Sequence, residues 1–397
     1  MLKKLMICIL VVFATKAQAQ NYDEAEVPVF TLPHILKMAN GQPVNTVKTW
    51  EQNRRPEILH LFEDNIYGAM PKTYDHIAYK ITAEDKNAMN GKAHLKIVTI
   101  TVYNSHTSVD IHVTLFTPNN GKPANPAFLF INNRDNNNTD PTRKIKSDFW
   151  PAEMVIDSGY AIATFNVNDA APDNKDNYTN GVLKLYPNQL TADNGMKAIG
   201  CWAWAASRVM DYFKTDSSID FAKVSIVGHS RGGKAALWAG AEDQRFAMIF
   251  ANCSGNTGAA LARRQFGETL KVINSHYPYW FCNNYKKYID DVNKLPVDQH
   301  MLIALLAPRP VYTTNATKDL WADPSGSYLS VYYAQKAYEL YGINPDLKAN
   351  PPPPNSPIIH KTIGYHIREG IHDLTSYDWS KFIRFASYQY AHSITNK

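Results

Sequence analysis

The 397-residue sequence predicts one α/β domain whose central sheet is mostly parallel and antiparallel at its N-terminal edge. The composition, 45% hydrophobic and 19% charged, is typical of a folded globular protein and excludes disordered, collagen-like and disulfide-dense chains. The first strand-like runs follow one another directly, whereas the later runs alternate with helical patterns. No repeat or linker divides the chain, so we expect residues 20–397 to form a single domain.

The N-terminal residues 1–19 have the three parts of a secretory signal peptide. Lys3 and Lys4 precede an apolar run over residues 5–13, and the segment ends in Ala17-Gln18-Ala19. The apolar run is shorter than the ~20 residues of a membrane span, and no later window reaches that length. The alternative is a buried N-terminal helix. We therefore expect a secreted or periplasmic protein with no membrane association after cleavage.

Charge and cysteine content exclude further function classes. Loss of residues 1–19 with their three lysines lowers the formal net charge from +5 to +2, which is no nucleic-acid signature. The remaining cysteines, Cys201, Cys253 and Cys282, form neither a CxxC pair nor a zinc spacing. The sequence therefore predicts no nucleic-acid partner and no metal site, and it leaves the pairing of the thiols open.

Hydrophobic periodicity places the individual elements. Strand patterns occupy residues 95–103, 109–116, 127–131, 160–165, 224–227, 248–251 and 311–314, and a later one lies within 361–370. Helical patterns occupy residues 196–213, 234–241 and 327–341, and a helix is expected after residue 375. The proline-rich residues 350–355 predict a stiff surface loop.

The most informative segment joins a predicted strand to a predicted helix through Gly-x-Ser-x-Gly. Residues 224–238 read VSIVGHSRGGKAALW, with Ser230 at the centre of the motif. Small residues on both sides of a serine permit the sharp strand-to-helix turn called a nucleophile elbow, which exposes the hydroxyl above a sheet. The helix start also offers backbone N–H groups to a developing oxyanion. The alternative is an ordinary glycine-rich turn.

A serine nucleophile requires a base and an acid, which follow it in the order acid and histidine in this type of fold. His372, in the loop after the 361–370 strand pattern, is the preferred base. His366 falls within the strand pattern, where a packing role is expected, and His300 comes too early in the chain. Asp319 follows the 311–314 strand and is the preferred acid. Asp323 precedes Pro324 and a predicted helix, so a capping role explains it equally well.

Several sequence blocks resemble the bacterial glucuronoyl esterases of carbohydrate esterase family fifteen. The resemblance covers about residues 125–390 and rests on five blocks in the family's order: 228–240, 259–269, 295–300, 307–310 and 319–324. It implies an α/β-hydrolase fold, a three-layer sandwich, and a monomeric enzyme without metal or cofactor. The implied reaction is hydrolysis of the ester that joins the (4-O-methyl-)glucuronic acid of glucuronoxylan to lignin alcohols.

The resemblance also implies roles for individual residues. Ser230 becomes the nucleophile, His372 the base, and Arg231 a support for the oxyanion, where a fixed positive charge would meet developing negative charge. Lys234, Glu268 and Trp321 match positions that hold the glucuronate ring. The alternatives are a solvated helix lysine, a surface carboxylate and a core tryptophan.

One departure from the family pattern concerns the acid. Many members carry a catalytic glutamate in a stretch like Asn-Glu-Ser-Gly, but this chain has Cys253 at that place. A thiol cannot stabilise an imidazolium as a carboxylate does. Some relatives place the acid after the later strand, which favours the triad Ser230, Asp319 and His372.

Three other functions remain open from the sequence. The protein could act on another plant polysaccharide ester, such as acetyl or feruloyl xylan. A prolyl-type peptidase is disfavoured because nothing suggests an N-terminal propeller domain. A catalytically impaired carbohydrate-binding homologue is supported only by Cys253.

Overall fold

The computed structural model describes residues 20–392, so the predicted signal peptide lies outside the described residues. A single nine-stranded sheet forms its centre, in the order β1-β2-β3-β5-β4-β6-β7-β8-β9. The strands are β1 (His76–Ala88), β2 (Ala93–Asn104), β3 (Thr107–Pro118), β4 (Asn125–Asn132), β5 (Ala161–Asn166), β6 (Ile219–His229), β7 (Met248–Asn252), β8 (Val311–Ala316) and β9 (Ile363–Arg368).

The helices predicted at residues 196–213, 234–241 and 327–341 and after residue 375 are present, and the other helices were not predicted. The α-helices are α1 (Val47–Thr49), α2 (Arg55–Phe62), α3 (Ala152–Asp157), α4 (Val167–Ala170), α5 (Ala198–Phe213), α6 (Arg231–Glu242), α7 (Leu270–His276), α8 (Gln299–Ala304), α9 (Pro324–Glu339) and α10 (Ser376–His392). Two π-helical segments, η2 (Trp50–Arg54) and η3 (Glu63–Tyr67), flank α2. Short 3₁₀ turns are η1 (Glu24–Glu26), η4 (Asn136–Thr139), η5 (Val182–Lys184), η6 (Pro187–Leu190), η7 (Ala262–Arg264), η8 (Asn283–Tyr288), η9 (Val292–Lys294) and η10 (Leu320–Ala322).

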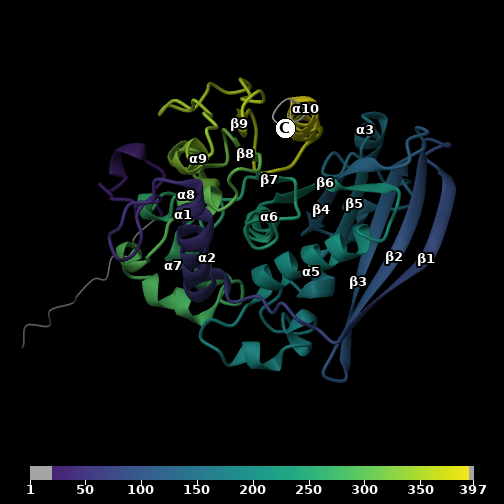
Figure 1. Cartoon of the computed structure of the whole chain (residues 1–397), viewed down its shortest axis with the longest axis horizontal. Coiled ribbons are helices and arrows are strands. Elements are labelled where there is room, and N and C mark those ends of the chain that lie inside the picture. Colours follow the sequence, from purple (N-terminus) through teal and green to yellow (C-terminus); the bar gives the residue numbers. More distant parts are fainter. Residues whose placement is uncertain (1–19, 393–397) are drawn as a thin grey trace, which may run out of the picture.

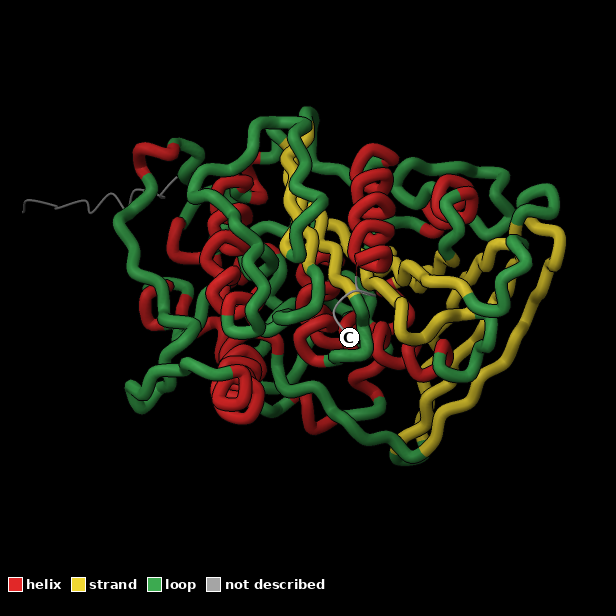
Figure 2. The backbone as a smooth tube through the Cα atoms, turned by 45° about the horizontal axis from the view of Figure 1, so that its top comes forward, coloured by secondary structure: helices red, strands yellow, loops and turns green. Residues whose placement is uncertain are grey.

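The type of strand pairing changes once across the sheet, from antiparallel to parallel at β5. β1, β2 and β3 pair antiparallel with one another, and β3 pairs antiparallel with β5. From β5 through β9 every pairing is parallel. Figure 2 shows the long strands of the antiparallel part extending away from the helical body. The predicted mostly parallel sheet with an antiparallel N-terminal edge is therefore confirmed.

Helices cover both faces of the parallel part, as a three-layer sandwich requires. On β4, Phe128 and Phe130 pack into one apolar cluster together with residues of α3 and α10, and the rings of Phe128 and Trp379 lie 5.8 Å apart. The alternating side chains Leu129 and Ile131 belong to the other cluster, which includes α5 and α6. Figure 1 shows α3 and α10 on one side of the sheet and α5 and α6 on the other.

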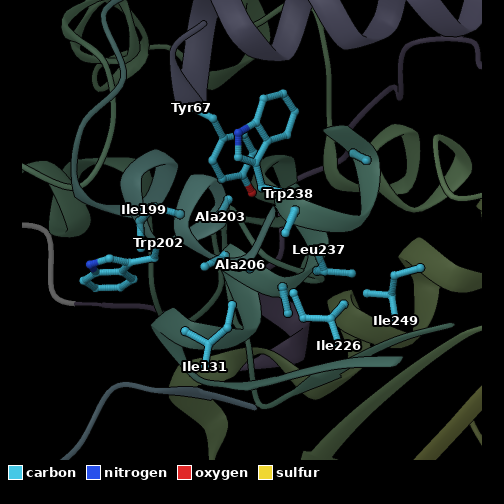
Figure 3. Packing of buried hydrophobic residues seen from close by; sticks show 14 of the residues in the cluster. Tyr67, Ile131, Ile199, Trp202, Ala203, Ala206, Ile226, Leu237, Trp238 and Ile249 are labelled. Carbon is cyan, nitrogen blue, oxygen red and sulfur yellow. The ribbon is translucent and has the colours of Figure 1, made fainter. Parts of the chain in front are cut away.

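A stacked aromatic pair holds the helix that follows the Gly-x-Ser-x-Gly segment. The rings of Trp238 on α6 and Tyr67 lie 4.5 Å apart at 8°, and the Tyr67 hydroxyl donates to the carbonyl of Thr257. Leu237, next to Trp238, faces Ile226 and Ile249 of the sheet (Figure 3). The position of α6 is thus fixed by packing from both sides.

The sequence prediction missed β1 and the helical segment over residues 47–67. β1 is an edge strand that pairs only with β2, and most of its side chains are exposed. Ile77, Tyr79 and Ile81 alternate in its first half, but the polar residues 84–87 interrupt the pattern over the rest of the strand. Within residues 20–392, none of the helices combines the length and the apolar character that a bilayer crossing requires.

Candidate active site

Ser230 occupies a strained turn between β6 and α6. Its φ of 55° and ψ of −125° lie in a region that a residue with a side chain rarely adopts. The Ser230 N–H donates to the carbonyl of Asn252 at 2.8 Å, which ties the turn to the end of β7. A Cβ atom at Gly228 would lie 2.0 Å from the carbonyl oxygen of Gly232, so the turn can close only around glycine. This is the geometry of a nucleophile elbow.

His372 and Asp319 lie on neighbouring loops at the same end of the sheet. Asp319 follows β8, His372 follows β9, and Nδ1 of His372 is 2.6 Å from Oδ2 of Asp319. A carboxylate can only accept, so Nδ1 carries the proton and Nε2 is left as the accepting nitrogen. The aspartate side chain is 2% exposed and that of the histidine 36%. The pair therefore offers one basic nitrogen to solvent or to a ligand.

These residues share a cavity of about 300 Å³ with the other residues that the sequence singles out. The seven predicted site residues all line it, and none is displaced to another part of the fold. The lining consists of Ser230, Arg231, Lys234, Cys253, Ser254, Gly255, Glu268, Tyr277, Trp280, Asp319, Trp321, Ala322 and His372.

The guanidinium of Arg231 is held in place on two sides. It forms an ion pair with Asp173 and lies over the rings of Tyr277 and Trp280, 5.3 and 4.9 Å from their centroids. Burial by itself would lower the pKa of Arg231, but the charge of Asp173 outweighs it and raises that pKa. Arg231 therefore presents a permanent positive charge beside the nucleophile.

Asp173 is a site residue that the sequence analysis missed. Its Oδ1 accepts hydrogen bonds from the hydroxyl of Tyr279 at 2.8 Å and from Nε1 of Trp280 at 2.9 Å, while Oδ2 receives Arg231. In the sequence, the aromatic run from Tyr277 to Trp280 was the only indication of this part of the site, and it lies in no predicted strand or helix. A distant loop aspartate gave no signal of its own.

Lys234 is buried and fully engaged within the protein. Its Nζ donates to Glu268 at 2.7 Å, to the carbonyl of Ser254 at 2.9 Å, and to the carbonyl of Asn256. Burial lowers the pKa of Lys234, and Glu268 counteracts this effect. Glu268 is 4% exposed, and its N–H donates to the carbonyl of Trp321 at 2.9 Å. The solvated lysine and the surface carboxylate considered from the sequence are therefore wrong.

The other acids and bases weighed from the sequence have packing or capping roles. His366 is buried between the hydroxyl of Tyr312 and the carboxylate of Asp378, at 3.0 and 2.9 Å. His300 contacts the carbonyl of Pro33 at 2.8 Å. Asp323 caps α9 by accepting from the N–H of Gly326 and pairs with Arg264.

A second histidine touches the ring of His372. The centroid of His229, the residue before the nucleophile, lies 4.6 Å from that of His372. Burial and the nearby His372, Arg134 and Arg231 hold the pKa of His229 well below its usual range, so this ring is neutral. Its Nδ1 lies 2.5 Å from the side-chain oxygen of Asn252. His372 therefore packs against an uncharged imidazole on this side.

An ion pair fastens the loop that carries His372. Nη2 of Arg134, which follows β4, lies 2.8 Å from a carboxylate oxygen of Asp373. The guanidinium of Arg134 also lies 3.9 Å from the ring centroid of Phe149. The loops after β4 and β9 are therefore joined beside the cavity.

Cys253 lies directly against the Asp319–His372 pair. None of the three cysteines of the described chain forms a disulfide, and all three are buried. Burial, with the charges of Asp319 and Asp378, raises the pKa of the Cys253 thiol well above its ordinary value. Cys253 is therefore a neutral thiol next to the carboxylate. Within the described residues, Cys253, Asp319 and His372 form a group whose side-chain atoms lie close enough together to hold a metal ion.

Comparison with known proteins identifies the family. Residues 100–342 match the family model for fungal glucuronyl esterases. The chain is 38% identical over 399 residues to a carbohydrate esterase of an unknown prokaryotic organism, an alignment that covers 93% of this chain and 91% of the relative.

The chain belongs to the glucuronoyl esterases of carbohydrate esterase family 15.

Solved structures of bacterial glucuronoyl esterases agree with this assignment. The enzyme from Solibacter usitatus is 35% identical, with a TM-score of 0.86 over 92% of this chain and 100% of that chain. A promiscuous family 15 esterase from a marine bacterial metagenome is 38% identical, with a TM-score of 0.85 over 93% and 99% of the two chains. The expected family, its α/β-hydrolase fold and its class as a carboxylic ester hydrolase are thereby confirmed.

Proposed function

We propose that the protein is a serine esterase that hydrolyses esters of (4-O-methyl-)glucuronic acid, such as those that join glucuronoxylan to lignin alcohols. The observation that carries the proposal is the strained Ser230 in one cavity with the hydrogen-bonded pair of His372 and Asp319. A relative from Schizophyllum commune, 26% identical over 83% of this chain and 80% of its own length, is a 4-O-methyl-glucuronoyl methylesterase.

In the proposed acylation, Nε2 of His372 takes the proton from Oγ of Ser230 as this oxygen attacks the ester carbonyl. The imidazolium that forms is stabilised through Nδ1 by Asp319. Negative charge develops on the carbonyl oxygen and is met by the backbone N–H of Arg231, the first residue of α6, and by its guanidinium. The alcohol then leaves with the proton from His372.

In the proposed deacylation, water replaces the alcohol and gives its proton to His372. Attack on the acyl-serine releases glucuronic acid and restores Ser230. Lys234, Glu268 and Trp321 are proposed to shape the sugar side of the cavity. Since all three N–H groups of Lys234 have protein acceptors, Lys234 contacts a sugar hydroxyl only by sharing or releasing one of them. The protein side chains supply each proton transfer in this scheme.

Hydrolysis of benzyl glucuronate by the wild type and the Ser230→Ala variant tests the proposal. The variant should lose ~10⁴- to 10⁶-fold in kcat. Ser330→Ala, which alters a buried serine of α9 outside the cavity, is the matched control and should retain activity. A chelator should leave the wild-type rate unchanged. Loss of turnover with chelator, combined with full activity in Ser230→Ala, would contradict the serine mechanism.

A broader range of esters is the second candidate, because one relative at 38% identity is described as promiscuous. Rates on acetyl and feruloyl model esters, compared with methyl glucuronate, distinguish the two. A strong preference for the glucuronate ester supports the first candidate. Equal or faster hydrolysis of the acetyl or feruloyl ester favours the second.

We also propose that the protein is exported and that residues 20–397 act as one monomeric catalytic domain. The pattern of residues 1–19 supports a signal peptide. N-terminal sequencing of the protein secreted from its host should begin at Gln20, and size-exclusion chromatography with light scattering should give the mass of one chain.

A further inference from the structure

Cys253 differs from the other two cysteines in its surroundings. Cys201 and Cys282 belong to the large apolar cluster of the described chain, whereas Cys253 is in neither of its apolar clusters. Its thiol has the carbonyl of Asp373 at 4.0 Å and lines the cavity beside Asp319 and His372. Cys253 is therefore a thiol placed among polar groups, which packing alone does not explain.

Three metal-ligating atoms converge at this point. Sγ of Cys253, a carboxylate oxygen of Asp319 and a ring nitrogen of His372 all lie within 4.8 Å of one another. The three residues follow β7, β8 and β9, which are adjacent strands, so the sheet itself holds them together. The backbone N–H of Cys253 donates to the carbonyl of Thr314 at 2.8 Å, which fixes the cysteine against β8.

The donor set and its spacing suit a thiophilic cation. Thiolate, imidazole and carboxylate are the ligands of zinc sites, and metal–ligand bonds of roughly 2.0–2.3 Å in a tetrahedron require ligand atoms about 3.3–3.8 Å apart. The three ligand atoms lie up to 4.8 Å apart, and rotation of the side chains would bring them to the tetrahedral spacing. The 2.6 Å contact between Asp319 and His372 is shorter than that spacing and would have to lengthen. Metal binding is therefore incompatible with the hydrogen bond between Asp319 and His372.

We propose that Cys253, Asp319 and His372 form an inhibitory binding site for a thiophilic divalent cation, of which Zn²⁺ is the probe. The cation displaces the thiol proton to solvent, and the imidazole proton moves from Nδ1 to Nε2 so that Nδ1 can bind the cation. The cation then has three protein ligands and a fourth position open to the cavity. Binding removes His372 from its role as base. Only this inhibitory consequence rests on the proposed function, because the binding itself requires no catalysis.

The binding test uses Co²⁺ and the Ser230→Ala variant, so that hydrolysis plays no part. A cobalt–thiolate charge-transfer band in the near ultraviolet should appear and saturate as Co²⁺ is added. A second substitution, Cys253→Ala, in this variant should abolish the band or weaken Co²⁺ binding at least tenfold. The matched substitution of another buried thiol, Cys282→Ala, should leave the band unchanged. Absence of the band, or its persistence without Cys253, would overturn the proposal.

The inhibition test compares each variant with its own rate in the absence of zinc. Zn²⁺ should inhibit the wild-type esterase, and a chelator should restore the rate. Cys253→Ala should raise the half-inhibitory zinc concentration at least tenfold, and Cys253→Ser serves the same purpose if the alanine variant is unstable. Equal zinc sensitivity in wild type and variants would overturn the site. If no ester is hydrolysed, the proposed function fails while the cobalt titration still decides the metal site.

Discussion

His372 and Asp319 form a hydrogen bond of 2.6 Å in which the aspartate is buried and the histidine faces the cavity. The proton on Nδ1 is thereby fixed, and Nε2 is the nitrogen that remains basic. This relationship gives the two residues unequal functions: Asp319 acts only through the imidazole, whereas His372 can meet a substrate.

Asp319→Asn is expected to lower kcat by ~10³- to 10⁴-fold, because an amide can hold the wrong imidazole tautomer and cannot balance an imidazolium. Steady-state kinetics on benzyl glucuronate, with circular dichroism to verify folding, measures this. Asp323→Asn is the control, since Asp323 pairs with Arg264 and caps α9. Near-normal turnover in Asp319→Asn would reject the assignment. Adding Cys253→Glu to that variant should restore part of the lost activity.

Arg231→Lys is expected to reduce kcat by about 10²-fold with a smaller change in KM. A lysine keeps the charge but loses the planar group that lies over Trp280 and pairs with Asp173. Asp173→Asn should lower kcat in the same direction by a smaller factor, since Arg231 keeps its charge but loses its ionic partner. A change confined to KM would instead make Arg231 a ground-state binding residue.

Lys234→Met is expected to destabilise the protein by about 3–5 kcal/mol, because it leaves the buried Glu268 carboxylate without its partner. The double variant Lys234→Met with Glu268→Gln should recover part of this loss, since no buried charge is then unpaired. Urea denaturation of the two single variants and the double variant measures the coupling. Additive losses would show that the two side chains do not depend on each other.

Three buried histidines make the stability of the protein depend on pH. Burial lowers the pKa of His229, His300 and His366 below the usual value. Below about pH 6.5 the unfolded chain binds protons at these residues while the folded chain does not. Their contribution is therefore complete above that pH and declines as the pH falls toward the folded-state pKa values, by at most about 1.4 kcal/mol per pH unit for each histidine.

Urea denaturation between pH 7 and pH 5 checks this dependence. His300→Gln, which keeps a donor for the carbonyl of Pro33 and lies outside the active-site cavity, should reduce the slope by up to the equivalent of one proton. An unchanged slope in that variant would show that His300 contributes nothing to the acid sensitivity.

The parts of the structure that sequence predicts best are those where local pattern and tertiary environment agree. The strand, turn and helix around Ser230 carry their own signals, because glycine and a buried strand are required there. Asp319 and His372 followed from their positions after predicted strands. By contrast, Asp173 reaches Arg231 across 58 residues of sequence, and such a contact depends on how the loops pack. β1 was not predicted because the apolar alternation covers only its first half, and its second half is exposed and largely polar.

Because the carboxyl ends of β7, β8 and β9 are adjacent, residues at different positions of the chain can contact the same histidine. Cys253 and Asp319 stand on neighbouring strands, and both lie within reach of the same imidazole. A carboxylate introduced at either position would meet His372 without any change in the backbone path of the sheet. The acid can thus change position from one of these two loops to the other during divergence. An intermediate sequence with a carboxylate on both loops would keep an acidic partner for His372 throughout.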